Sequence, residues 1–308
     1  MAVIRGRYIS LSRSQLRRQG LEQQLEGLGV QEQYSWFPAK SGDAKAAAAR
    51  GLLAGEWGLW QSWLKLLQEE LRRPASTDDW LHILEDDAEL SRHFLVFCQQ
   101  LKPAPPAFDL LFTDMYVNPS IHRSLSKEHK GLLAKGVVQL KTDLYTGCSA
   151  SVLIHRACIP AVLHCLEKSV NADGPLLPLD NQLRRLFHQQ QLRFARTAPF
   201  ITGVQRESIE HSTIQEREQQ DQSVLLTQQI CSNLRRQLSV LETNDPSNEL
   251  IQLMHRLAQG HGQPSPAELT RNITLQLMHL AEQQKLLRFG KQPRLKREPD
   301  NGQYSSQR

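Results

Sequence analysis

Three consecutive carboxylates follow a short apolar run. Glu85-Asp86-Asp87 comes directly after the run from Trp80 to Leu84, whose length and turn-forming flanks predict a buried strand. Adjacent carboxylates repel one another, and a hard divalent cation held by oxygen ligands, Mg²⁺ or Mn²⁺, relieves that repulsion. In open α/β sheets, ligands bind beyond the carboxyl ends of strands. The triplet is therefore a candidate metal site, and the alternative is a solvated acidic turn.

A further carboxylate, Asp114, follows another apolar run. The run from Phe108 to Phe112 also predicts a buried strand. In one sheet the two strand ends would form one crevice that Asp114 helps to line; the alternative is a solvated loop aspartate. His82, His155 and His164 lie in apolar runs without metal-ligand spacing. We interpret these histidines as core or helix-surface residues.

The elements that must position these residues alternate between strands and helices. Strands are predicted at residues 2–11, 80–84, 108–112, 136–145 and 150–154, and helices after Ser12 or Ser14 up to Gly29, along 57–71, and at about 157–167. The middle helix carries an apolar stripe at three- and four-residue steps, which is typical of a buried face. This stripe consists of Trp57, Trp60, Leu64, Leu67 and Leu71. The alternation over residues 1–214 predicts an α/β layered domain with a largely parallel sheet.

The composition changes at about Gln215. Glutamine becomes frequent, aromatic residues become scarce, and residues 215–290 carry helical patterns that include a capping box at Ser265-Pro266-Ala267-Glu268. Residues 291–308 read as a basic tail without regular structure. We expect a separate helical extension, whose apolar stripes beside a basic tail suit self-association or peripheral contact with an anionic membrane.

The overall composition is that of a globular protein. The chain has 308 residues, 40% of them hydrophobic and 22% charged, which excludes wholesale disorder and a disulfide scaffold. The net charge of +5 is spread along the chain, so nucleic acid is not an expected partner. The 5 cysteines lack zinc-ligand spacing and are expected to be reduced thiols. With no signal-like or membrane-spanning apolar run, the expected location is the cytoplasm.

Several blocks, in the right order, resemble glycosyltransferase family 25, which contains bacterial lipopolysaccharide galactosyltransferases and animal collagen galactosyltransferases. The blocks are Ile9 to Arg18, Gly55-Glu56-Trp57-Gly58 with Ser62, His82 to Asp87, Gly147 to Ile154, Pro178-Leu179-Asp180, and Pro199 to Ser212. They span about residues 3–214, and the acidic block is the most specific. The family has Ser-His where this chain has Ser62-Trp63, so the contribution of that histidine is absent.

The resemblance implies a GT-A type fold and metal-dependent, inverting transfer of a hexose, with UDP-galactose as the expected donor. The acceptor would be an oligosaccharide or glycolipid of lipopolysaccharide or another surface glycan, at the inner face of the cell membrane. The resemblance assigns Asp86 and Asp87 to Mn²⁺ or Mg²⁺ and the donor diphosphate, and Ser10, Arg13, Arg17, Glu85 and Asp86 to donor binding. Arg18 is a further candidate for donor phosphate. The alternative for the arginines is a solvated helix face.

Asp180 is the candidate base that removes the acceptor hydroxyl proton. The alternative for Asp180 is a helix N-cap for Asn181 onward. Two other functions stay open at this point. One is a catalytically silent nucleotide-sugar or glycan-binding scaffold, which the Trp63 departure favours. The other is a metal-dependent phosphodiesterase or hydrolase, which the lack of a histidine-rich metal cluster disfavours.

Overall fold

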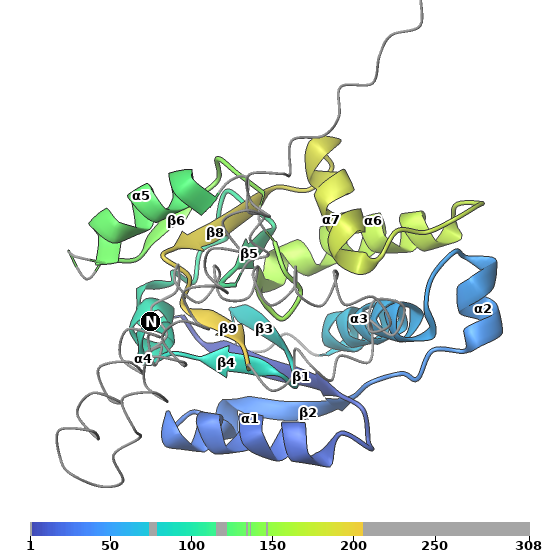
Figure 1. Cartoon of the computed structure of the whole chain (residues 1–308), viewed down its shortest axis with the longest axis horizontal. Helices are drawn as coiled ribbons and strands as arrows, with labels where there is room; N and C mark the ends of the chain where they lie inside the picture. The colour runs from blue at the N-terminus through green and yellow to red at the C-terminus, as the bar shows by residue number, and fades with distance from the viewer. Residues whose placement is uncertain are drawn as a thin grey trace, which may run out of the picture. The chain divides into compact units, whose positions relative to one another are not determined.

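The computed structural model describes residues 2–73, 79–114, 122–133, 135, 137–145 and 147–205. These residues all belong to one compact unit (Figure 1). The predicted helical extension at 215–290, the basic tail at 291–308 and most of the Pro199 to Ser212 block lie outside the described residues. In the described part of the chain, no helix has the length and apolar character needed to cross a bilayer.

A seven-stranded sheet in the order β2-β1-β3-β7-β5-β8-β6 forms the centre of the fold. The strands in that order are Tyr34–Pro38, Ile4–Ser10, Trp80–Glu85, Ser151–His155, Leu110–Phe112, Phe194–Ala198 and Gln139–Lys141. β2, β1, β3, β5 and β8 run in one direction, and β7 and β6 run in the other. The predicted α/β class with a largely parallel sheet is confirmed.

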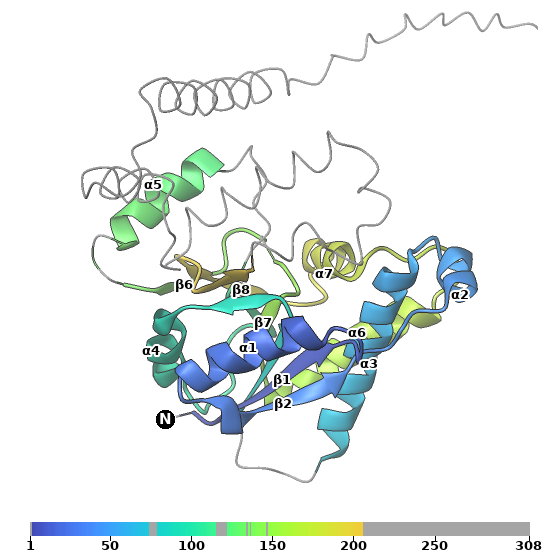
Figure 2. The same cartoon turned by 60° about the horizontal axis from the view of Figure 1, so that its bottom comes forward.

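Helices pack on both faces of this sheet (Figures 1 and 2). They are α1 (Gln15–Gly27), α2 (Ala44–Ala49), α3 (Ala54–Arg72), α4 (Arg92–Gln100), α5 (His122–Leu133), α6 (Ile159–Asn171) and α7 (Leu179–His188), with short 3-10 turns at Gln31–Gln33 and Arg156–Cys158. Ile83 packs into the core cluster that contains the buried residues of α3, α6 and α7. Its neighbour Leu84 packs with α1 and α4. Because both faces are covered, every residue from Trp80 to Leu84 is buried, without the alternation of a half-exposed strand.

The predicted apolar stripe of α3 is buried in the middle of the helix, as expected, but it is exposed at its last residue. Leu67 is fully buried, whereas Leu71 is 47% exposed. The buried face ends instead at Glu70, whose carboxylate accepts a hydrogen bond from Arg7 at 2.8 Å. Two more arginines pair with the same carboxylate. These ion pairs allow the charged Glu70 side chain to be buried, whereas the sequence pattern predicted Leu71 as the last buried residue of the stripe.

Other boundaries differ from the prediction near the sheet edges. The strand predicted at 136–145 is only Gln139–Lys141, because it is an edge strand whose residues are partly or fully exposed. The first helix ends at Gly27 and is followed by Gly29 at φ +69°, as the expected glycine stop requires. The sequence pattern did not identify β2 or β8.

A separate two-stranded sheet follows the acidic triplet. β4 (Ala88–Leu90) pairs antiparallel with β9 (Thr202–Val204), so the chain turns out of the large sheet at the end of β3 and enters the small one. The triplet therefore occupies the junction between the two sheets.

Candidate functional site

The acidic triplet lies at the carboxyl end of β3. Glu85 is the last residue of that strand, and Asp86 and Asp87 form the turn that leads into β4. The backbone N–H of Gln205 donates to the Asp87 carbonyl at 2.8 Å, which ties the turn to the end of β9. Asp86 is only 8% exposed, which does not fit a solvated turn.

Asp86 is held by residues of β1 and α1. The Ser10 hydroxyl, at the end of β1, donates to Asp86 Oδ2 at 2.8 Å. Arg17 Nη1 lies 3.5 Å from Asp86 Oδ1 and 3.7 Å from Asp87 Oδ2. Burial raises the pKa of Asp86, and the contacts with Ser10 and Arg17 partly offset that rise. One guanidinium nitrogen thus faces both aspartates.

Glu85 and Asp180 meet at Ser149. The Ser149 hydroxyl donates to Glu85 Oε1 at 2.6 Å, and the Ser149 backbone N–H donates to Asp180 Oδ1 at 2.8 Å. Asp180 lies in the first turn of α7, whose N-cap is Pro178. The N-cap alternative for Asp180 is therefore wrong, because its carboxylate accepts from another segment of the chain. The Tyr145 hydroxyl donates to the Asp180 carbonyl at 3.1 Å.

The carboxylates of this site interact electrostatically. Burial raises the pKa of Glu85 to about 8, and the negative charges of Asp87, Asp180 and Asp86 add to the rise. Burial also raises the pKa of Asp180 to about 6, although hydrogen bonding from Ser149 works against that rise. A site that disfavours ionised carboxylates to this extent would be stabilised by a cation placed among them.

The residues present fit a divalent cation that shares its coordination with a ligand. Within the described segments, no group of three or more His, Cys, Asp or Glu side chains could hold a metal ion alone. Mg²⁺ is usually held by one or two carboxylates together with substrate phosphates. Asp86 and Asp87 already face one positively charged atom, Arg17 Nη1. A two-carboxylate set completed by a diphosphate matches this arrangement.

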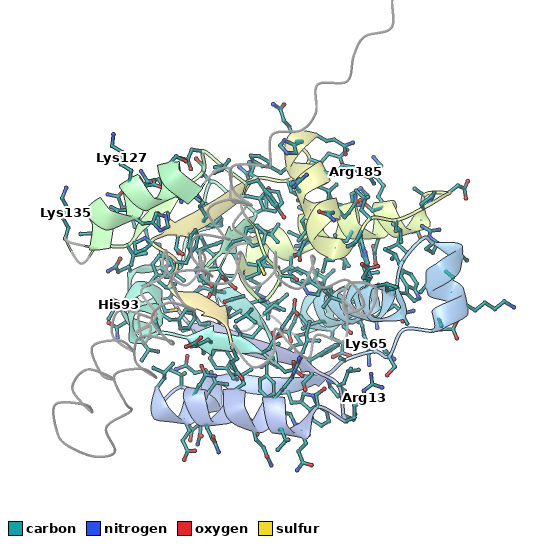
Figure 3. All side chains as sticks on the ribbon, viewed as in Figure 1. Arg13, Lys65, His93, Lys127, Lys135 and Arg185 are labelled. Carbon is teal, nitrogen blue, oxygen red and sulfur yellow. The ribbon has the colours of Figure 1, made fainter. Side chains whose placement is uncertain are left out.

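The other two candidate arginines occupy different surroundings. The Arg18 guanidinium lies 4.2 Å from the Trp36 ring centroid, and its Nη1 donates to the Leu11 carbonyl at 3.4 Å. Trp36 in turn donates its indole N–H to the Ser10 carbonyl at 3.0 Å. Arg13 is exposed just before α1 (Figure 3). Arg17 is thus the candidate arginine that the structure brings within ion-pair distance of the triplet.

The Gly55-Glu56-Trp57-Gly58 block stabilises the start of α3. The Leu53 backbone N–H donates to Glu56 Oε2 at 2.7 Å, which caps the helix. The Ser62 hydroxyl accepts from the Lys40 backbone N–H at 2.8 Å and donates to the Gly58 carbonyl at 2.7 Å. Trp63, which replaces the family histidine, is fully buried in the core. The Trp63 position therefore belongs to helix packing in this chain.

Asp114 and His82 are both buried. Asp114 is fully buried just beyond β5, so the solvated-loop alternative is wrong. His82 is buried, with Nδ1 2.7 Å from the Tyr34 hydroxyl and Nε2 2.9 Å from the Ser151 hydroxyl. Burial lowers the pKa of His82 to about 3. The prediction that His82 is a satisfied core histidine is confirmed.

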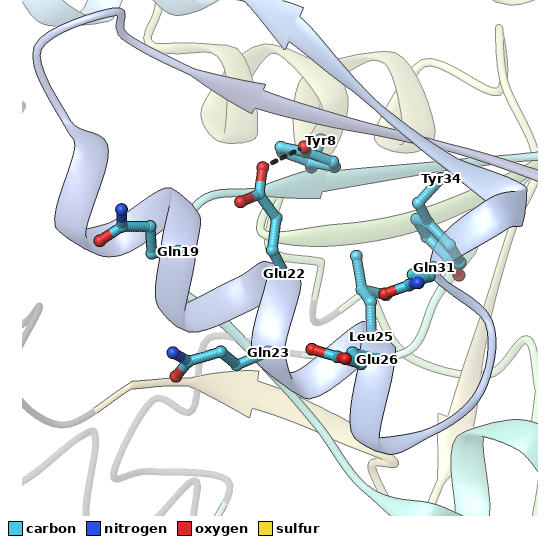
Figure 4. A pocket seen from close by; sticks show the side chains of 8 residues that line it. All are labelled: Tyr8, Gln19, Glu22, Gln23, Leu25, Glu26, Gln31 and Tyr34. Carbon is cyan, nitrogen blue, oxygen red and sulfur yellow. Dashed lines mark hydrogen bonds between the residues drawn. The ribbon is translucent and has the colours of Figure 1, made fainter.

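A pocket of about 530 Å³ lies between α1, β1 and β2 (Figure 4). Within it the Tyr8 hydroxyl donates to Glu22 at 2.6 Å. The described lining contains Glu22 and Glu26 but no lysine or arginine. This charge does not suit a diphosphate, so the acidic triplet remains the candidate site.

Sequence reasoning missed the role of Ser149. The residue lies in the small-residue block before β7, but its position beside Glu85 follows from the antiparallel pairing of β3 with β7. Nothing in a local pattern reveals which strands pair. The serine itself is visible in the small-residue block, but no signal in the sequence places it beside Glu85.

No family model and no curated protein matches the sequence. Solved structures that match include a glycosyltransferase involved in glycosylation of the major capsid of PBCV-1, with TM-score 0.34, 9% identity, and coverage of 63% of this chain and 80% of that chain. A Drosophila galactosyltransferase mutant in complex with manganese, UDP-Gal and xylobiose matches with TM-score 0.33, 8% identity, and coverage of 63% and 64%.

Mouse xyloside xylosyltransferase 1 matches with TM-score 0.25, 12% identity, and coverage of 62% and 64%. The aligned part thus spans less than two thirds of the length of the galactosyltransferase and of the xylosyltransferase. These TM-scores are too low for the likeness to indicate an activity.

Proposed function

We propose that this chain is a GT-A type glycosyltransferase that moves a hexose from a UDP-sugar to a saccharide acceptor, with inversion and with help from a divalent metal. The observation that carries the proposal is the convergence on Ser149. Glu85 of the acidic block and Asp180 of a distant block both accept hydrogen bonds from this residue. Two blocks that sequence resemblance assigned to one kind of site thus lie side by side.

The donor end of the site would be formed by Asp86, Asp87 and Arg17. Asp86 and Asp87 would hold Mn²⁺ or Mg²⁺, and Ser10 orients Asp86 through its 2.8 Å hydrogen bond. Such a cation, when bound, neutralises the charge that develops on the leaving diphosphate. Arg17 supplies a planar guanidinium suited to phosphate oxygens.

The acceptor end would be formed by Asp180. In an inverting transfer, the acceptor oxygen bonds to the anomeric carbon, the bond from that carbon to the diphosphate oxygen breaks, and UDP departs. The acceptor hydroxyl proton passes to the Asp180 carboxylate. A pKa of about 6 leaves Asp180 ionised at pH 7 and more basic than an exposed aspartate. Ser149 donates its backbone N–H to Asp180 Oδ1, and we assign the acceptor proton to the other carboxylate oxygen.

The finer identity of substrates and place of action is proposed from the family resemblance. We propose galactose as the transferred sugar and an oligosaccharide or glycolipid of lipopolysaccharide or another surface glycan as the acceptor. The reaction would take place in the cytoplasm, at the inner face of the cell membrane.

A panel of UDP-sugars tests this function. The full chain is incubated with each sugar, with Mn²⁺, Mg²⁺ or a chelator, and with or without a mixture of oligosaccharide acceptors. Released UDP, released sugar phosphate and donor binding are measured. We expect metal-dependent UDP release that acceptors stimulate. Binding without turnover would instead identify a silent scaffold. Acceptor-independent release of a sugar phosphate would identify a phosphodiesterase.

A further inference from the structure

Arg17 occupies the place where the acidic pair would receive a cation. Its Nη1 atom lies 3.5 Å from Asp86 Oδ1 and 3.7 Å from Asp87 Oδ2. The side chain belongs to the first turn of α1 and is only 22% exposed. The contact is therefore partly shielded from water, where an ion pair is stronger than at an open surface.

The geometry makes the guanidinium and a divalent cation competitors. A cation shared by Asp86 and Asp87 must lie within about 2.5 Å of one oxygen from each, and Arg17 Nη1 already faces one oxygen of each. Both positive groups cannot remain in contact with the pair without mutual repulsion. A cation that arrives alone must therefore displace Arg17 and leave it without its carboxylate partners.

A diphosphate changes this balance. Its oxygens can accept hydrogen bonds from the displaced guanidinium, which matches phosphate geometry. The same oxygens can complete the coordination of the cation. The cost of moving Arg17 is then offset by a new partner for the same side chain.

We propose that Arg17 is a resident counter-ion of Asp86 and Asp87 that moves to the donor diphosphate when metal binds, so that metal and nucleotide bind cooperatively. This inference rests on the proposed function and adds to it a coupling between the two ligands. By linkage, UDP strengthens Mn²⁺ binding by the same factor as Mn²⁺ strengthens UDP binding.

Mn²⁺ binding to the full chain tests the proposal without any measurement of activity. The dissociation constant of Mn²⁺ is measured from the electron paramagnetic resonance signal of the free ion, with no nucleotide and with saturating UDP. Arg17→Gln is expected to bind Mn²⁺ alone roughly tenfold more tightly than the wild type, because no ion pair has to be broken. The tightening that UDP produces is expected to be smaller in Arg17→Gln by roughly the same factor or more.

Two further variants control for charge and for folding. Arg72→Gln removes the same charge from an exposed site on α3 and should leave both Mn²⁺ constants near those of the wild type. Arg17→Lys keeps the positive charge, so its affinity for Mn²⁺ alone should stay near that of the wild type. If Arg17→Gln does not fold, Arg17→Lys still tests the proposal. The factor by which UDP tightens Mn²⁺ binding should be smaller in Arg17→Lys than in the wild type, because a lysine cannot pair bidentately with phosphate.

The outcomes separate the inference from the function on which it rests. Equal Mn²⁺ constants in the wild type and Arg17→Gln, with equal tightening by UDP, would overturn the role of Arg17 while the proposed function stands. No Mn²⁺ binding by any variant, with or without UDP, would overturn the proposed metal-dependent function and the inference together.

Discussion

The backbone N–H of Ser149 donates a 2.8 Å hydrogen bond to the side chain of Asp180. The hydroxyl of the same serine donates to Glu85 at 2.6 Å. A single residue thus orients two carboxylates that belong to different blocks of the sequence. Since a backbone N–H cannot be removed by side-chain substitution, the position of Asp180 should survive changes at Ser149 better than that of Glu85.

Asp180→Asn is expected to lower transfer to acceptor by roughly 10²- to 10⁴-fold, the usual contribution of a positioned base. Asparagine has the same size, and its side-chain oxygen can still accept the Ser149 hydrogen bond. UDP-sugar and Mn²⁺ affinities should therefore stay near those of the wild type. Initial rates and equilibrium binding of the donor measure the two effects separately.

The matched control for this variant is Asp173→Asn, at an exposed site. It makes the same chemical change and should leave transfer unaltered. Near-normal transfer by Asp180→Asn would remove Asp180 from the mechanism. The search for a base would then move to Asp114, because Glu56 already caps α3.

The pH dependence of transfer should show the ionisation of Asp180. Because its pKa is raised to about 6, the carboxylate is protonated and inactive as a base below that pH. We expect kcat/KM to rise with pH, with the midpoint of the rise near pH 6. This rise should be absent from the pH profile of the residual activity of Asp180→Asn. A wild-type profile that is flat between pH 5 and 7 would contradict the assignment.

The sequence was sufficient for those parts of the fold that local pattern determines. Ile83 and Leu84 are both buried in β3, as the continuous apolar run before Glu85 predicted. Strand order, and the reversed direction of β7, depend on contacts between distant segments that no local pattern encodes. Glu70 rather than Leu71 is buried, because the Glu70 carboxylate has arginine partners from β1, which again are distant in sequence.

The candidate site, too, was predictable only in those features that depend on one stretch of sequence. The strand-end position of Asp86 could be predicted from one stretch of sequence. Its contacts with Ser10 and Arg17 depend on the parallel pairing of β1 with β3. The meeting of Ser149 with Asp180 depends on where α7 begins relative to β7, so the shared hydrogen-bond donor was not predictable.

Glu85→Gln is expected to make stability less dependent on pH. The folded pKa of Glu85 is about 8, above its ordinary value of 4.5, so the folded state retains a proton that the unfolded state releases. The free energy of unfolding therefore falls as pH rises from about 4.5 to about 8, by on the order of a few kcal/mol from this group. Glutamine accepts the Ser149 hydrogen bond without carrying charge. The free energy of unfolding, measured with urea at pH 5 and at pH 8, should fall less in the variant than in the wild type. Equal falls in the two proteins would contradict the buried position of Glu85.

Removal of residues 215–308 should leave metal-dependent UDP release measurable. Ser10, Arg17, Ser149, Asp180 and the acidic triplet all precede that segment, and β9, which holds the turn, ends at Val204. The truncated protein is compared with the full chain by UDP release and by donor binding. Complete loss of donor binding in a truncated protein that still folds would show that the extension helps to build the site.

Asp87→Ala should abolish Mn²⁺-dependent binding of the UDP-sugar. The substitution removes one of two carboxylates that face the cation position, and loss of such a ligand should weaken metal binding by roughly a hundredfold or more. The fold should persist, because the Asp87 backbone carbonyl, which accepts from Gln205 at 2.8 Å, is unchanged. Donor affinity is measured by calorimetry with Mn²⁺ and with a chelator, and thermal unfolding reports on the fold.

Asp173→Ala, at an exposed site, is the matched control and should behave as the wild type. Equal donor affinity with Mn²⁺ and with chelator in the wild type would show that no metal takes part in binding, and the acidic triplet would then need another explanation.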